Sequence, residues 1–126
     1  YKSEKALSLA IVVKDGDQHI GNCGFNDIDY ANRKAVFGIL IGKKDQWGKG
    51  YGPEAARLIV DYGLNQLNLH RISLTVYSNN PRAIRAYEKV GFVHEGTLRE
   101  SYFRDGRYYD TLVMAIVNRD WNNDQP

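Results

Sequence analysis

The sequence has few cysteines, few prolines and no long apolar run, and each scarcity excludes a class of protein. The single cysteine, Cys23, excludes an internal disulfide and is typical of a reducing compartment, so we expect a cytoplasmic protein. Proline occurs only at positions 53, 81 and 126, and no segment is of low complexity, which argues against a disordered or fibrous chain. The longest nearly apolar stretch, Leu7–Val13, is far shorter than the about 20 residues that span a bilayer, so we expect no membrane association.

Charge and size narrow the classes further. The 126 residues include 17 Lys and Arg against 15 Asp and Glu, a formal net charge of +2, and the two signs are interspersed. Because the basic residues form no run, we expect no nucleic-acid partner. Three histidines and one cysteine are scattered without ligand spacing, so we expect no metal site. The length predicts one domain over residues 1–126 with one core.

The first third of the sequence has the pattern of an antiparallel meander. Leu7–Val13 is rich in β-branched residues and stops before Asp15-Gly16, a hairpin signal. A second strand is predicted over residues 18–25, continuing loosely to 28. Ala35–Ile41 is nearly all apolar, which predicts a third strand buried on both faces.

Helical and strand patterns alternate in the remainder. From Pro53, apolar residues recur at helical spacing, at Ala56, Ile59, Tyr62 or Gly63, and Leu67. A strand is predicted over Arg71–Tyr77, then a helix that begins after Asn80 and ends at Gly91. Strands are predicted over 92–98 and 102–103 and, after an Asp105-Gly106 turn, over 108–117. This order predicts an α/β (α+β) fold, a single mixed, largely antiparallel twisted sheet with flanking helices.

A glycine-rich segment, Trp47-Gly48-Lys49-Gly50-Tyr51-Gly52, stands directly before the predicted helix. Unobstructed backbone N–H groups beside a helix N-terminus suit a phosphate or pyrophosphate, although a flexible strand–helix turn has the same composition. No Ser or Thr follows Lys49, as a Walker loop would require. The segment also follows a meander rather than a parallel strand, which disfavours a Rossmann fingerprint.

Two motifs together carry a resemblance to a known family. Gly50 and Gly52 match the end of the pattern Arg/Gln-x-x-Gly-x-Gly/Ala, from which Trp47 departs. The segment from Asn80 to Phe92 matches all fixed positions of Asn-x-x-Ala-x-x-x-Tyr-x-x-x-Gly-Phe. With these motifs the chain, from about residue 7 to its end, resembles the GNAT family of N-acetyltransferases. Its last third is similar to the branch of ribosomal-protein N-terminal acetyltransferases and spermidine acetyltransferases.

The resemblance implies a site for acetyl-CoA. The implied donor-binding residues are Ile39, Leu40, Ile41, Trp47, Gly48, Lys49, Gly50, Tyr51, Gly52, Asn80, Ala83 and Tyr87. In the family, backbone amides of the glycine loop hold the pyrophosphate, and the strand before it pairs with the pantetheine arm almost as an added strand. A backbone N–H of that strand polarises the acetyl carbonyl. Trp47 stands where the family has Arg or Gln. This difference removes a polar side chain but leaves the backbone amides of the loop intact.

The resemblance makes Tyr87 the catalytic residue, the acid that protonates the departing thiolate. A phenol is protonated at neutral pH, which suits that role. Spacing alone favours another interpretation, in which Tyr87 is a packing residue on an amphipathic helix. Asn80 likewise has two interpretations, a helix cap or a side chain that bonds the pantetheine arm.

The predicted function is acetyl-CoA-dependent acetylation of a primary amine, on a small molecule or a peptide, by direct attack. A non-catalytic coenzyme A-binding or regulatory module is the alternative, and the presence of Tyr87 favours catalysis. Because the sequence opens at Tyr1 on the meander, we expect it to lack the family's first strand and helices. A homodimer or larger homo-oligomer is expected from the resemblance to this branch.

Several residues keep weaker alternatives. The candidate general bases, among which no motif selects, are Glu54, Glu88, Glu95, Glu100, His19, His70 and His94. Cys23 is expected to be a small buried hydrophobe rather than a nucleophile. The aromatic cluster of Tyr102, Phe103, Tyr108 and Tyr109 suits a substrate mouth or a dimer face, but cross-strand packing is the favoured interpretation.

Overall fold

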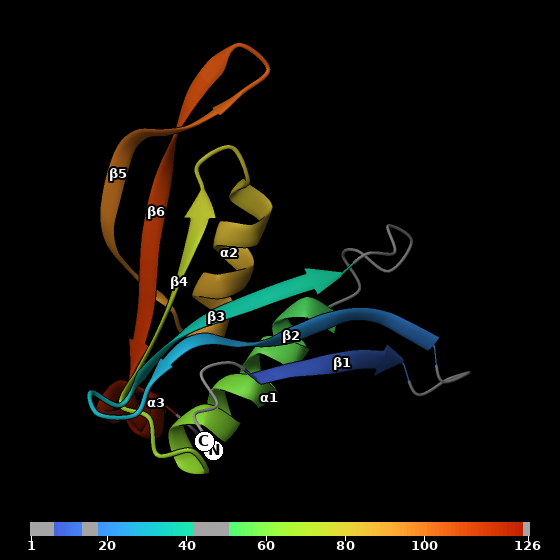
Figure 1. The fold of residues 1–126 in the computed structure, drawn as a ribbon, viewed down its shortest axis with the longest axis vertical. Helices are drawn as coiled ribbons and strands as arrows, with labels where there is room; N and C mark the ends of the chain where they lie inside the picture. Colours follow the sequence, from blue (N-terminus) through green and yellow to red (C-terminus); the bar gives the residue numbers. More distant parts are fainter. Residues whose placement is uncertain (1–6, 14–17, 42–50, 125–126) are drawn as a thin grey trace.

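The computed structural model describes residues 7–13, 18–41 and 51–124. It contains one six-stranded sheet in the order β1-β2-β3-β4-β6-β5 (Figure 1). The strands are β1 (Leu7–Val13), β2 (Gln18–Asp29), β3 (Lys34–Ile41), β4 (Arg71–Tyr77), β5 (Val93–Arg104) and β6 (Arg107–Val117). The helices are α1 (Tyr51–Asn65), α2 (Pro81–Val90) and α3 (Asn118–Asp124). Only β3 and β4 pair in parallel, so the predicted mixed, largely antiparallel sheet is confirmed.

The strands follow the predicted meander and hairpin. β1 pairs with β2 and β2 with β3, so that Cys23 lies opposite both Leu9 and Ile39. The Asp15-Gly16 signal lies outside the described residues. Between β5 and β6 the predicted two-residue turn is present, with φ of 53° at Asp105 and 78° at Gly106. Positive φ at both positions matches the twist of the flanking strands.

The core lies between the sheet and its helices. Along β4, Ile72, Leu74 and Val76 are buried, and the residues between them are half-buried or exposed. α1 packs against this same face so closely that a Cβ on Gly63 would stand 2.6 Å from Cζ of Phe25. We call this side of the sheet the helix face and the other side the open face.

Two predicted helix boundaries and one predicted burial pattern are wrong. α1 begins at Tyr51 and not at Pro53, which is tolerated because the first N–H groups of a helix have no intrahelical partner. It ends at Asn65, so Leu67 lies outside the helix. Of the two alternatives for the buried position in its last turn, Gly63 is buried and Tyr62 is exposed. In β3, Ala35 and Phe37 are buried but Val36 and Gly38 only half-buried, because the helices of the described chain cover only one face of the strand.

The helix α3 was not predicted from the sequence. Its residues Asn118–Asp124 are mostly polar and show no apolar period, but Trp121 is buried and its Nε1 donates to Oδ1 of Asp61 at 3.2 Å. Asn118 Nδ2 donates to the carbonyls of Leu64 and Leu69. Within the described ranges, no helix is long and apolar enough to cross a membrane.

Candidate active site between β3 and β4

The central feature of the candidate site is the separation of the two parallel strands. β3 and β4 pair only at Lys34↔Arg71, Ala35↔Ile72 and Val36↔Ser73. Beyond that point β3 runs on to Ile41 and β4 to Tyr77 in different directions (Figure 1). β2 still pairs with β3 up to Ile41, so within the described ranges the β4-facing edge of residues 37–41 has no strand partner. A row of free backbone N–H and C=O groups on such an edge can pair with an extended ligand.

The helix that flanks this opening is defined at its start by Asn80. Asn80 Oδ1 accepts a hydrogen bond from the backbone N–H of Ala83 at 3.2 Å, and Pro81 occupies the first helical position. The acceptor oxygen satisfies a backbone donor that has no partner within the helix. The capping interpretation of Asn80 is therefore confirmed. The amide nitrogen remains available for a second role.

The same helix is ended by Gly91 and Phe92. Gly91 has a φ of 125°, its N–H donates to the carbonyl of Glu88 at 3.1 Å, and the N–H of Phe92 donates to the carbonyl of Tyr87 at 3.0 Å. This is the Schellman pattern, in which the residue after the glycine also packs on the helix. Phe92 does so on Tyr87, with ring centroids 5.8 Å apart. The local motif thus fixes the position of the Tyr87 ring.

Tyr87 lies on the helix face beside the opening. Its ring meets Phe37 of β3 edge to face, with centroids 6.4 Å apart at 85°. Burial raises the pKa of the Tyr87 hydroxyl above its ordinary value of 10.0, because desolvation disfavours the phenolate. No described residue forms a hydrogen bond with this hydroxyl. A protonated, half-buried O–H can donate to a ligand that enters from the β3–β4 gap.

The other residues predicted to bind acetyl-CoA lie partly within and partly outside the described chain. Ile39, Leu40 and Ile41 lie in β3, on the strand whose β4 edge is free. Tyr51 and Gly52 form the first turn of α1, so the N–H groups of that turn have no intrahelical acceptor. Trp47, Gly48, Lys49 and Gly50 lie outside the described residues.

The candidate bases are dispersed. Glu95 is held by Arg71, whose Nη1 and Nη2 donate to it at 2.8 and 2.6 Å, and these bonds lower the pKa of Glu95. His94 Nε2 lies 3.0 Å from Oγ1 of Thr97. Glu54 is exposed in the first turn of α1, where its negative charge interacts favourably with the helix dipole. None of the described carboxylates or imidazoles is thereby selected as a base.

The hairpin aromatics pack across the strands as expected. Tyr102 pairs with Tyr109 and Phe103 with Tyr108, with centroids 6.3 and 4.9 Å apart. A further contact was not predicted from the sequence: Tyr102 stacks on Tyr77, with ring centroids 3.7 Å apart and planes 3° apart. Both rings were visible as aromatic residues at strand ends, but no local signal links positions that are 25 residues apart.

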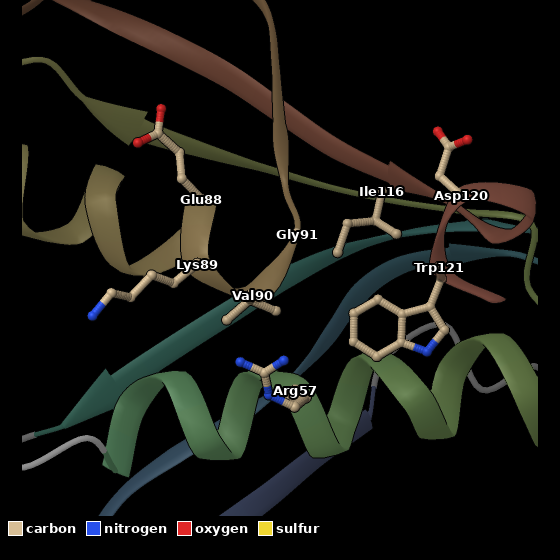
Figure 2. A pocket seen from close by; sticks show the side chains of 8 residues that line it. All are labelled: Arg57, Glu88, Lys89, Val90, Gly91, Ile116, Asp120 and Trp121. Carbon is tan, nitrogen blue, oxygen red and sulfur yellow. The ribbon is translucent and has the colours of Figure 1, made fainter. Parts of the chain in front are cut away.

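A separate hollow of about 300 Å³ lies where α1, α2 and α3 meet. Figure 2 shows Arg57 of α1 pointing toward Val90, with Trp121 closing one side. Its charged lining mixes signs: Arg57 and Lys89 against Glu88 and Asp120. Of the candidate bases it is lined by Glu88, and it is lined by none of the residues predicted to bind acetyl-CoA. Within the described part of the chain, no group of three or more metal-ligating side chains comes together.

Comparison with known proteins gives a consistent result. Residues 1–93 match the acetyltransferase (GNAT) domain. The chain is 37% identical over 117 residues to the uncharacterized N-acetyltransferase p20 of Bacillus licheniformis, and 40% identical over 113 residues to a spermidine N(1)-acetyltransferase of Vibrio cholerae. These matches cover 93% and 89% of this chain but 65% of each relative.

Solved structures agree with these sequence matches. A crystal structure of mutant forms of the spermidine/spermine N-acetyltransferase SpeG from Vibrio cholerae superimposes with a TM-score of 0.89 at 33% identity. The match covers 99% of this chain and 74% of that one. The chain therefore belongs to the GNAT family of acetyltransferases, whose acetyl donor is acetyl-CoA.

Proposed function

We propose that this chain catalyses the transfer of an acetyl group from acetyl-CoA to a primary amine. The observation that carries the proposal is the β3–β4 separation, with the Tyr87 ring packed beside it on Phe37 of β3. The chain spans 65% of the length of the curated relatives named above, so the proposal concerns the chemistry that these residues support.

The described residues fit the donor. The pantetheine arm is extended and carries two amides, which match the free N–H and C=O groups along residues 37–41 of β3. We assign the arm to Ile39, Leu40 and Ile41, to the amide nitrogen of Asn80 and to the α2 surface at Ala83. The pyrophosphate is assigned to residues 47–52, at the N-terminus of α1, where the helix dipole favours an anion.

The chemistry is a direct displacement at the thioester carbonyl. The neutral amine forms a bond to the carbonyl carbon, and the carbon–sulfur bond then breaks. Tyr87 gives its hydroxyl proton to the sulfur, the product nitrogen releases a proton to solvent, and Tyr87 regains a proton from solvent. A backbone N–H on the free edge of β3 polarises the carbonyl oxygen. The raised pKa of Tyr87 keeps the donor protonated across the neutral range.

We assign the acceptor to the primary amines, with a small polyamine as the preferred class. The support is the 40% identity to a protein named as a spermidine N(1)-acetyltransferase. A peptide or protein N-terminus is the second acceptor class and is included in the test. Self-association, a cytoplasmic location and a single domain over residues 1–126 stay predictions from the sequence.

The decisive experiment measures thiol release from acetyl-CoA with a panel of polyamines, amino acids, aminoglycosides and N-terminal peptides. We expect turnover with at least one polyamine. Binding of acetyl-CoA by calorimetry without turnover of any amine would instead identify the non-catalytic alternative.

The donor assignment has its own variant. Gly50→Val should weaken acetyl-CoA binding by about tenfold or more, because a β-branched side chain intrudes where the loop backbone meets the pyrophosphate. Gly96→Val is the matched control, since a Cβ at Gly96 meets nothing within 4 Å. Equal affinities of the two folded variants would remove the glycine loop from the donor site.

A further inference from the structure

The open face of the sheet carries an aromatic pair at the wide end of the β3–β4 opening. Val76 is buried on the helix face, so the next residue, Tyr77, projects to the open face, where 44% of it is exposed. Tyr77 is the last residue of β4 and lies four positions beyond the last pair between β3 and β4, at Ser73. It therefore stands beside the gap rather than within the paired part of the sheet.

The Tyr77 ring is not free to turn. It stacks on Tyr102 of β5 with centroids 3.7 Å apart and planes 3° apart, although β6 separates the two strands in the sheet. The surface that the two rings leave exposed is flat, apolar and rich in π electrons. Such a surface binds methylene chains and attracts ammonium groups.

The position of Tyr102 depends on an irregularity in β5 between Leu98 and Tyr102. Glu100 has a φ of 50°, an unfavourable value for a residue with a side chain. Its N–H donates to Oδ1 of Asp110 at 2.9 Å, and the N–H of Asp110 donates to Oγ of Ser78 at 3.0 Å. Asp110 thus connects the irregular turn of β5 to the residue that follows Tyr77.

A second set of bonds supports the same arrangement. Ser101 Oγ donates to the carbonyl of Leu98 at 3.0 Å and lies 2.6 Å from Oγ1 of Thr111, which is buried. Arg104 Nη1 donates to the Tyr102 hydroxyl at 3.1 Å, at the edge of the ring. Because this hydrogen bond lies at the ring edge, it does not occupy the outer faces of the stacked pair.

The described residues cover the two faces of the gap to different extents. On the helix face the gap is bordered by Tyr87 and by the rings of Phe37 and Phe92, which belong to the core. Under the proposed function, this side holds the donor and the departing thiolate. The amine then reaches the carbonyl carbon from the open face, where Tyr77 stands.

We propose that Tyr77 and Tyr102 form the wall of the acceptor site, which binds an alkylamine that carries a second positive charge. In this proposal, which rests on the proposed function, Asp110 is a positioning residue that acts through the Glu100 N–H. The pair determines how well an acceptor binds, and the chemical step belongs to the groups on the helix face.

The test compares acceptor kinetics for three ring variants with spermidine as the probe. Tyr77→Leu and Tyr102→Leu should each raise the KM for spermidine by about tenfold, since loss of the aromatic surface removes both stacking and cation–π attraction. The KM for acetyl-CoA and kcat at saturating spermidine should stay within about twofold. Tyr77→Phe keeps the ring and should keep the wild-type KM.

Phe103→Ala is the matched control. Phe103 neighbours Tyr102 in the hairpin, is 59% exposed and packs only on Tyr108 among the aromatic contacts of the described chain. We expect its acceptor KM to equal that of the wild type. If the two Leu variants turn over spermidine with an unchanged KM, the acceptor wall is wrong and the proposed function stands. If the wild-type chain acetylates no amine, both are wrong.

Asp110 separates positioning from direct contact. Asp110→Asn keeps an oxygen that accepts from the Glu100 N–H, whereas Asp110→Ala leaves that donor and the strained turn unsupported. We expect Asp110→Asn to preserve the spermidine KM and Asp110→Ala to raise it by about the same factor as Tyr102→Leu. Equal increases in both would contradict the positioning role, because they would mean that the carboxylate charge itself holds the amine.

Discussion

The two faces of the sheet present tyrosines on opposite sides of one opening, and they hold them by different means. On the helix face, Tyr87 sits in an edge-to-face cluster with Phe37 and Phe92. On the open face, Tyr77 is 44% exposed and is held by one stacked ring, Tyr102. Among the described residues, the contrast is one of packing: ring contacts enclose the tyrosine on the helix face, and the tyrosine on the open face stays partly exposed.

The difference also lies in how far apart the supporting residues are in sequence. Tyr87 is positioned within thirteen residues, by the cap at Asn80 and by the Gly91-Phe92 pattern at the other helix end. Tyr77 depends on Tyr102, which in turn depends on Asp110, 33 residues beyond Tyr77. We expect local support to survive substitution elsewhere, and long-range support to respond to changes in the β5–β6 hairpin.

The largest effect is expected on the helix face, from Tyr87→Phe. If the hydroxyl protonates the thiolate, kcat should fall by about 10²- to 10⁴-fold. The ring remains to pack on Phe37 and Phe92, so the free energy of unfolding should change by about 1 kcal/mol or less. Affinity for acetyl-CoA and the acceptor KM should be nearly unchanged.

Steady-state kinetics between about pH 6 and 9, with chemistry shown to be rate-limiting, measure this prediction. A folded Tyr87→Phe enzyme that keeps its kcat would reduce Tyr87 to a packing residue. The two faces would then differ in burial but not in chemical role.

The second effect concerns the packing that defines the helix face. A Cβ on Gly63 would stand 2.6 Å from Cζ of Phe25 and 3.1 Å from Cδ1 of Ile72, both buried. Gly63→Ala should lower the free energy of unfolding by about 1–2 kcal/mol, since overpacking outweighs the gain in helix propensity. Urea titration of Gly63→Ala against Gly96→Ala tests it, because Gly96 has open space. A stabilised Gly63→Ala would show that the Phe25 ring moves without cost.

The order of the elements and the residues around α2 could be predicted from the sequence, because their signals are local. Asn80, Pro81 and Gly91 mark the helix ends through capping and positive φ, and the alternation in β4 marks its buried face.

The extent of β3–β4 pairing could not be predicted, since paired and unpaired segments have the same apolar pattern. Glu100 gave no sign of its positive φ, because a glycine or asparagine would be the expected signal for such a backbone. The short helix at Asn118 escaped detection because only one of its residues, Trp121, is apolar.

A smaller effect is expected from Asn80, the residue that caps the N-terminus of α2. Asn80→Ala should cost about 1 kcal/mol of stability through loss of the cap to the Ala83 N–H. Asn80→Ser keeps a capping oxygen but lacks the amide nitrogen, so it should restore stability and still weaken acetyl-CoA binding. Thermal unfolding and calorimetry on both variants measure the two roles separately. Wild-type affinity in Asn80→Ser would leave Asn80 with the capping role alone.

The smallest effect is expected on the open face, where the Arg71–Glu95 pair connects β4 to β5 across β6. Its bonds lower the pKa of Glu95 from the reference value of 4.5, so its stabilisation is present above that pH and is lost as the pH falls through the folded-state pKa. Both side chains are about one-third exposed, at 35% and 37%, so solvent screening limits the contribution to about 0.5–1 kcal/mol.

Glu95→Gln should therefore lower the free energy of unfolding by that amount at about pH 7 and by much less at an acidic pH below the folded-state pKa of Glu95. Urea titrations of both proteins at the two pH values give the difference directly. Asp29, whose pKa is also lowered, titrates in both proteins and cancels from the comparison. A difference that stays the same at both pH values would mean that Glu95 stabilises by packing along β5 and not by its charge, and the open face would then carry no pH-dependent contact at this position.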